Sequence, residues 1–155
     1  MTDNIRVIAS DFDGTILKDG AQHVDEVYFP LIRELKSMGI SFIAASGRQY
    51  ANLRRLLWPV ADEISYICEN GALIAQGGRI LYQNEIDRRI ALPLIADMQA
   101  VSGTETVVSG ADSSYLVPVD PRFPVLLREK VKNQVTVLEN FEEMPVPMIK
   151  ISIFF

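Results

Sequence analysis

Residues 5–15 read Ile-Arg-Val-Ile-Ala-Ser-Asp-Phe-Asp-Gly-Thr, a short, mainly apolar run that ends at two aspartates. Apolar runs of this length are typical of strands that are buried on both faces of a parallel sheet. A turn directly after the strand can direct the carboxylates of Asp11 and Asp13 into one crevice, and Gly14 allows the backbone to make that turn. This stretch therefore predicts a buried strand with an acidic site at its carboxyl end.

Two further apolar runs follow along the chain, and both also end at polar residues. Residues 40–45 lead into Ser-Gly-Arg at 46–48, and residues 65–68 lead into Glu-Asn-Gly at 69–71. Between the runs, apolar residues recur at helical spacing. Strand, helix, strand, helix, strand is an α/β pattern, and it predicts a doubly wound, Rossmann-like parallel sheet with right-handed crossovers.

The three polar clusters fall where such a fold binds its ligands. In parallel α/β sheets, ligands sit beyond the carboxyl ends of the strands, and each cluster directly follows a predicted strand. Carboxylate and carbonyl oxygens of Asp11 and Asp13 would suit a hard cation such as Mg²⁺. Aspartate is also a covalent phosphate acceptor in phosphoryl-transfer enzymes.

Several of these residues also have a purely structural interpretation. An Asp-Gly pair is common in solvated turns, so Asp13 and Gly14 could form no more than a turn. Ser46 could be the N-cap of the helix that follows it, which is compatible with a role in binding phosphate. A calcium-binding loop does not fit, because Thr15 replaces the third acid and Gln22 stands where a bidentate glutamate is needed.

The pattern changes after the third run. Gly77-Gly78 separates two short apolar segments, and paired glycines supply the positive φ of a tight two-residue hairpin turn. A helix, a hairpin, a weaker helix and a final strand within residues 148–155 are expected after that. We place a domain boundary near Glu85, which predicts a core portion over residues 1–85 and a second region over residues 86–155.

Four features together resemble the haloacid dehalogenase superfamily. They are the apolar strand, the Asp-Phe-Asp-Gly-Thr that follows it, a second strand ending in Ser-Gly-Arg and a third ending in Asn-Gly-Ala. The similarity is greatest to the Cof-type, sugar-phosphatase-like branch. It covers residues 5–86 well and the rest loosely, as part of the α/β cap that this branch inserts after the third core strand. The resemblance implies a phosphoric monoester hydrolase that uses Mg²⁺.

By this resemblance, Asp11 attacks phosphorus and forms an aspartyl phosphate, while Asp13 protonates the leaving oxygen and later activates water. Mg²⁺ would bind the carboxylate of Asp11 and the backbone carbonyl of Asp13. Phosphoryl transfer depends above all on positioning and charge neutralisation, which these roles supply. The residues that match positions near the phosphate or the substrate are Thr15, Ser46, Gly47, Arg48 and Asn70. Arg48 could instead be a surface residue, and Asn70 a turn residue.

Two motifs that the resemblance implies are not found in this sequence. The family carries a lysine at a late helix and a later acidic pair, whereas Lys150 is the last lysine here and is followed by a strand pattern. No aspartate follows Asp120. We therefore expect a truncated form of a longer enzyme, incomplete or weakly active, or a short protein without catalysis. The first strand would then be an exposed sheet edge, which predicts self-association.

Composition excludes several classes of function. The 155 residues carry a net charge of −5, whereas nucleic-acid binders have an excess of Lys and Arg. Cys68 is the single cysteine, so no internal disulfide or cysteine zinc site is possible. No apolar run approaches the roughly 20 residues of a membrane span, and the first residues do not form a signal peptide. We expect a cytoplasmic protein that binds a small phosphorylated metabolite, with no nucleic acid and no membrane.

Two other functions stay open. The first is a non-catalytic, truncated homologue that keeps the crevice and binds a phosphorylated ligand or a protein partner. The second is a phosphoacceptor signalling domain, which also combines an aspartate, Mg²⁺ and a doubly wound sheet. Such domains carry the acceptor after the third strand, where this chain has Glu-Asn-Gly at residues 69–71, so we rank this function last.

Overall fold

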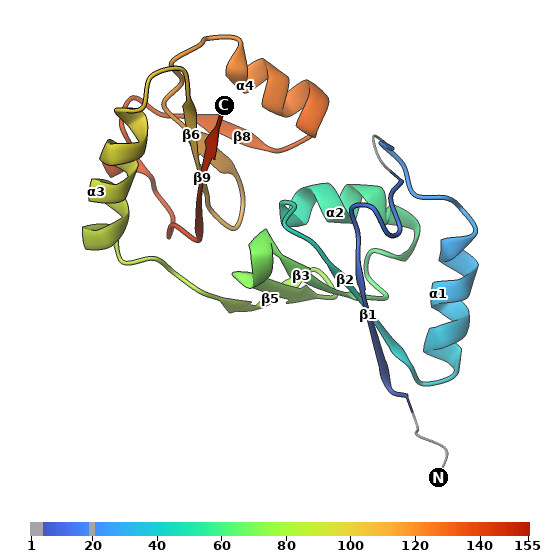
Figure 1. Ribbon diagram of the computed structural model, residues 1–155. Coiled ribbons are helices and arrows are strands. Elements are labelled where there is room, and N and C mark those ends of the chain that lie inside the picture. Colours follow the sequence, from blue (N-terminus) through green and yellow to red (C-terminus); the bar gives the residue numbers. More distant parts are fainter. Residues whose placement is uncertain (1–4, 19–20) are drawn as a thin grey trace. The chain divides into compact units, whose positions relative to one another are not determined.

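The computed structural model describes residues 5–18 and 21–155. The chain divides into two compact units, Met1–Tyr82 and Gln83–Phe155, and each contains a sheet (Figure 1). The division falls close to Glu85, where the sequence predicts a boundary. None of the helices in the described ranges has the length and apolarity that a membrane span requires.

The first unit is built on a five-stranded sheet in the order β1-β2-β3-β4-β5. The pairs β1–β2 and β2–β3 are parallel, and β3–β4 is antiparallel. Its helices and strands are β1 (Val7–Asp11), α1 (Tyr28–Ser37), β2 (Ser41–Ala45), α2 (Tyr50–Leu56), β3 (Ser65–Cys68), β4 (Leu73–Gln76) and β5 (Arg79–Gln83). Short 3-10 turns lie at Trp58–Val60 and Glu69–Gly71. The α/β prediction is confirmed, and the three parallel strands are those predicted from the apolar runs.

The parallel register brings the carboxyl ends of β1 and β2 together. Asp11, the last residue of β1, lies opposite Ala45, the last residue of β2. Ser46 begins the turn after β2, and it therefore lies at the same end of the sheet as Asp11. The amide of Ser46 donates to the carbonyl oxygen of Ile67 in β3 (2.9 Å), which ties this turn to the next strand.

Burial differs between the two faces of the first sheet. On one face Ala44, Tyr66 and Cys68 are fully buried. On the other face Ile43 and Ile67 are only partly buried. The two right-handed crossovers run in the same direction across the sheet, so α1 and α2 cover the same face. The expectation that these strands are buried on both faces is therefore wrong for the part of this unit that the structure describes.

The outer strands of the first sheet are β1 and β5. The first strand is thus an edge, as expected, and its apolar Val7 is 53 % exposed. At the other side, β4 and β5 form the predicted hairpin. Gly77 and Gly78 in its turn have φ angles of 54° and 77°, which residues with a side chain rarely adopt.

The second unit is built on a four-stranded sheet in the order β8-β7-β6-β9. Its elements are α3 (Arg88–Gln99), β6 (Glu105–Ser109), β7 (Ser114–Leu116), α4 (Phe123–Leu126), the π-helical turn η3 (Leu127–Val131), β8 (Val135–Val137), the 3-10 turn η4 (Phe141–Glu143) and β9 (Lys150–Phe154). The predicted helices, hairpin and final strand are present. β8 is a strand that the sequence patterns do not predict, and it pairs in parallel with β7.

Helices cover both faces of this second sheet. Ala91 of α3 belongs to a buried cluster that includes Val108 of β6. Val107 precedes Val108 in β6, so its side chain points to the other face of the sheet, where it packs with Leu127 of η3. All five residues of β6 are buried as a result.

Candidate active site

The loop after β1 is anchored by the buried Phe12. The carbonyl oxygen of Phe12 accepts hydrogen bonds from the amides of Ile16 (3.1 Å) and Leu17 (2.8 Å). Gly14, with a φ angle of 80°, makes the turn predicted after β1. Phe12 is buried whereas Asp11 and Asp13 are exposed, so the loop presents both carboxylates at the surface.

Asp13 joins the loop after β1 to the turn after β2. The hydroxyl of Ser46 donates to Oδ2 of Asp13 at 3.1 Å. Arg48 donates to Oδ1 of Asp13 from Nε at 2.9 Å and from Nη2 at 2.7 Å. The structure therefore brings together three of the residues predicted for the site, from segments more than 30 residues apart in the sequence.

These contacts set the charge of Asp13. The hydrogen bond from Arg48 is the main cause that lowers the pKa of the Asp13 carboxyl below its ordinary value, and the hydrogen bond from Ser46 acts in the same direction. Partial burial of Asp13 opposes the shift, but it is the smaller effect. Asp13 is thus held as a carboxylate by two donors of the neighbouring turn.

Asp11 has a more open environment at the end of β1. It is exposed, and the hydroxyl of Thr15 lies 3.4 Å from its Oδ2, at the outer limit of a hydrogen bond. Thr15 thus lies beside Asp11, in the loop that follows β1.

Ser46 is not the cap of the following helix. α2 begins at Tyr50, its N-cap is Gln49, and no side chain caps it. The hydroxyl of Ser46 instead accepts a hydrogen bond from the amide of Arg48 (3.1 Å) while it donates to Asp13. The interpretation of Ser46 as the N-cap is therefore wrong, and its hydroxyl belongs to the carboxylate site.

Asn70 and Gly47 meet beside this group. A Cβ atom placed on Gly47 would lie 2.3 Å from Oδ1 of Asn70, so no side chain fits at position 47 without displacing Asn70. Asn70 contributes no hydrogen bond to the carboxylate of Asp11 or Asp13 among the described residues. Its neighbour Glu69 is 2 % exposed, a buried acid that the polar Glu-Asn-Gly segment does not reveal.

Asp11 and Asp13 offer oxygen atoms of the type that Mg²⁺ prefers as ligands. The carboxylate of Asp11 and the backbone carbonyl of Asp13 are oxygen ligands, and Mg²⁺ usually combines one or two carboxylates with waters and substrate phosphates. Within residues 5–18 and 21–155, no group of three or more His, Cys, Asp or Glu residues is arranged to hold a metal ion. Any Mg²⁺ here would therefore take part of its coordination from phosphate and water.

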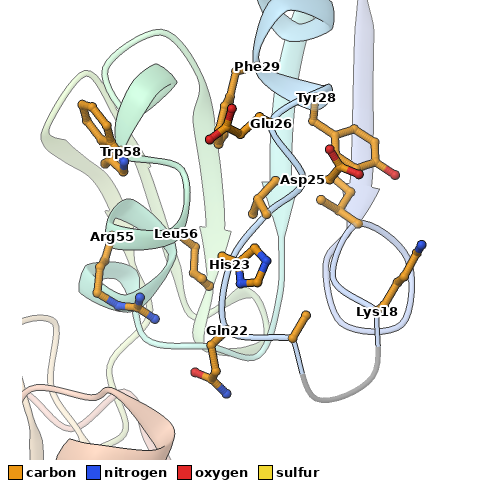
Figure 2. A pocket seen from close by; sticks show the side chains of 13 residues that line it. Lys18, Gln22, His23, Asp25, Glu26, Tyr28, Phe29, Arg55, Leu56 and Trp58 are labelled. Atoms are coloured by element: carbon orange, nitrogen blue, oxygen red, sulfur yellow. The ribbon is translucent and has the colours of Figure 1, made fainter.

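A cavity of about 960 Å³ lies elsewhere in the first unit, between the segment before α1 and the end of α2. Figure 2 shows Arg55 and Trp58 on one side of it and His23 and Glu26 on the other. Its lining includes neither of the predicted catalytic aspartates. His23 lies in the loop before α1 and is not part of the carboxylate site.

Comparison with known proteins identifies a family for this chain. The profile of the haloacid dehalogenase-like hydrolase family matches residues 8–155. YbjI of Escherichia coli (strain K12), named 5-amino-6-(5-phospho-D-ribitylamino)uracil phosphatase, is 25 % identical over 141 residues, which cover 91 % of this chain and 52 % of YbjI. The chain thus spans about half the length of that relative.

Solved structures share the fold. A structure from Eubacterium rectale superposes with a TM-score of 0.85 at 25 % identity, covering 97 % of this chain and 58 % of the other. A haloacid dehalogenase-like hydrolase from B. subtilis superposes with a TM-score of 0.78 at 18 % identity, covering 95 % and 60 %. Since the family profile matches nearly the whole sequence, this chain belongs to the haloacid dehalogenase-like hydrolases.

Proposed function

We propose that this chain carries the nucleophile-bearing part of a magnesium-dependent phosphatase that acts on small phosphorylated metabolites. One observation carries the proposal: Ser46 and Arg48 together hold a carboxylate, that of Asp13, two residues after the exposed Asp11. A pair of donors that binds one anion can bind another, and two oxygens of a phosphate can accept parallel hydrogen bonds from the planar guanidinium of arginine.

In the proposed reaction, an oxygen of Asp11 bonds to phosphorus as the bond from phosphorus to the leaving oxygen breaks. Arg48 turns from Asp13 to the phosphate, which removes the main contact that holds Asp13 as a carboxylate. Asp13, protonated in the substrate complex, then gives its proton to that leaving oxygen. A water molecule then attacks the aspartyl phosphate, and Asp13 takes a proton from the water as the bond to Asp11 breaks. Inorganic phosphate leaves and the carboxylate of Asp11 is restored.

The remaining residues of the site would hold the phosphate. Ser46 and Arg48 are proposed to donate to its oxygens, and Thr15 to lie beside the nucleophile. Gly47 contributes its backbone, and Asn70 contributes through its contact with that glycine. Mg²⁺, bound by the Asp11 carboxylate and the Asp13 carbonyl, would neutralise phosphate charge.

The substrate class is proposed from the relative and from the two units. YbjI is named for a phosphorylated ribityl compound, and we extend that class to this chain as a sugar-phosphate-like metabolite. Residues 1–85 would form the core portion, and residues 86–155 part of the cap that selects the substrate. We propose that full activity belongs to a longer chain.

A non-catalytic role is the second candidate, and the ion pair itself favours it. Within the described residues, Arg48 is the one cation in contact with either aspartate of the site. A site with little positive charge could bind a phosphorylated ligand without accelerating its hydrolysis, because charge stabilisation is a large part of phosphoryl-transfer catalysis.

Beryllofluoride separates the two candidates, because it adds to a nucleophilic carboxylate as a mimic of the phosphoryl group. With Mg²⁺ present, ¹⁹F NMR of the 155-residue chain should show a bound signal that Asp11→Asn abolishes. Asp25→Asn, a matched change at another exposed aspartate of the same unit, should leave the signal intact. No bound signal in the wild-type chain, or one that survives Asp11→Asn, would rule out Asp11 as the phosphate acceptor.

A further inference from the structure

The turn after β3 has an unusual backbone. Glu69, Asn70 and Gly71 follow one another with φ angles of 51°, 58° and 93°. Three successive positive φ values are rare, and only glycine adopts them without strain, although asparagine tolerates them better than most residues. Strain of this kind persists where the surrounding structure fixes it, and it is often found at functional sites.

This turn contacts the turn after β2 at two places. The amide of Glu69 donates to the carbonyl oxygen of Arg48 at 3.2 Å. The side chain of Asn70 reaches across to Gly47, where its Oδ1 occupies the space that a Cβ atom would need. The left-handed backbone directs Asn70 toward the neighbouring turn rather than along its own strand.

The 46–48 turn is in this way held from both sides. On one side Ser46 and Arg48 donate to the carboxylate of Asp13. On the other side Asn70 lies against Gly47, the residue between them. A shift of Gly47 would move both donors together, because each is bonded to it directly along the chain.

We propose that Asn70 is a positioning residue that fixes the 46–48 turn, so that Ser46 and Arg48 reach the same anion. The effect on phosphate binding rests on the function proposed above, whereas the effect on the Asp13–Arg48 ion pair does not. Asn70 suits this role because it accepts the left-handed conformation and is long enough to reach the adjacent turn.

The ion pair offers a direct spectroscopic test. The Nε–H of Arg48 donates to Asp13 in the free chain, so its ¹H–¹⁵N resonance should be shifted and protected from exchange. The resonance is assigned by its loss in Arg48→Lys. Asn70→Gly keeps the positive φ but removes the side chain, and it should return the resonance to the position and exchange rate of a free arginine. A crystal structure of this variant answers the same question through the distance from Arg48 Nη2 to Asp13 Oδ1, which is 2.7 Å in the wild-type chain.

Two further variants test whether Asn70 acts through its contact with Gly47. Gly47→Ala needs the space of the Asn70 amide and should weaken the ion pair as Asn70→Gly does. If both act through one contact, the double variant should lose no more than Asn70→Gly alone. Lys132→Gly is the matched control, because Lys132 also has a positive φ (64°) but lies in the second unit. An unchanged Arg48 resonance and ion-pair distance in Asn70→Gly would overturn the proposal, and so would additive losses in the double variant.

Inorganic phosphate with Mg²⁺ separates this proposal from the proposed function. If both hold, Asn70→Gly should weaken phosphate binding on the order of tenfold, which corresponds to about 1.4 kcal/mol. If the ion pair loosens but phosphate affinity does not change, Asn70 positions the turn, and the proposal that Ser46 and Arg48 bind phosphate is wrong. If the ion pair stays intact, the positioning role is wrong whatever phosphate does.

Discussion

Asp13 in the first unit and Glu105 in the second are both acids close to the end of a strand, but they are held in different ways. Asp13 has a side chain that is 52 % exposed, and its partners are the side chains of Ser46 and Arg48. Glu105 is 8 % exposed, and its carboxylate accepts from the backbone amides of Val119 (3.1 Å) and Asp120 (2.6 Å).

The two acids differ in how easily their hydrogen-bond donors can move. Side-chain donors such as Arg48 can turn from Asp13 to an incoming anion, because their torsions are free to change. Backbone amides cannot do so without unfolding the loop that carries them. Glu105 thus fixes the path of the chain after β7, whereas the donors around Asp13 remain available to a ligand.

The largest expected effect concerns the rate of catalysis. With Mg²⁺ and p-nitrophenyl phosphate, we expect the 155-residue chain to turn over at least 10²–10³-fold more slowly than a typical enzyme at about 10 per second. The reason is that the loss of one preorganised charge-stabilising donor alone costs about 10²–10³ in rate. Turnover near 10 per second that Asp11→Asn abolishes would show that the first unit needs no further cations.

The next effect tests the comparison of the two acids directly. Glu105→Ala leaves two buried amides without an acceptor and should destabilise the second unit by about 2–4 kcal/mol. Asp13→Ala should change the stability of the first unit by less than about 1 kcal/mol, because the side chain of Asp13 is 52 % exposed and solvent screens its ion pair. Urea unfolding should be followed by amide resonances of each unit, since the two need not unfold together. Equal losses would contradict the distinction between the two acids.

Alkaline pH should weaken each unit through one buried tyrosine. Burial is the main cause that raises the pKa of Tyr66 in the first unit, and it raises that of Tyr115 in the second to about 12. The folded state favours the neutral phenol, so this stabilisation is complete below the unfolded pKa of about 10 and is lost as pH rises through the folded pKa.

Phenylalanine variants assign that loss to one unit at a time. Tyr66→Phe removes a hydrogen bond to the carbonyl of Ala61 (3.0 Å), and Tyr115→Phe removes one to Asp112 (2.8 Å), each at a cost of about 1 kcal/mol near neutral pH. Each variant should flatten the decline in stability above about pH 10 for its own unit alone. A decline that persists in the substituted unit would mean that other groups cause it.

The smallest expected effect is weak self-association through β1. Val7 on β1 and Val137 on β8 are both edge-strand valines of similar exposure, 53 % and 47 %. We expect association through Val7 because one face of its sheet is left partly open, whereas both faces of the second sheet are covered. Val7→Lys should reduce the sedimentation coefficient at micromolar concentration, and Val137→Lys should not. A wild-type chain that is a compact monomer with a cooperative melt would refute this.

Local patterns predicted the elements of the fold well. Three apolar runs became β1, β2 and β3, and Gly77-Gly78 became a hairpin turn, because each depends on neighbouring residues. Strand β8, by contrast, has three residues and forms through its pairing with β7, about 20 residues earlier in the sequence. The partly open face of the first sheet was missed for a similar reason, since apolar composition does not say which strands or helices are present to cover a face.

The candidate site was predicted in its residue types but not in its contacts. The Asp-x-Asp-Gly-Thr and Ser-Gly-Arg segments marked Asp13, Ser46 and Arg48, and the parallel register places them together. The ion pair itself depends on the register of two strands, which the residues alone do not fix. Neither the burial of Glu69 nor the contact of Asn70 with Gly47 has a signature in the sequence, because both depend on a left-handed backbone.

The reactivity of Cys68, at the end of β3, can be used to measure local unfolding of the first unit. It is the only thiol in the chain and is fully buried, so a thiol reagent can modify it only when the strand that leads into the Asn70 turn becomes exposed. The labelling rate then measures the free energy of that opening. Without any substitution, the labelling rate of Cys68 can therefore test whether phosphate and Mg²⁺ stabilise the first unit against opening.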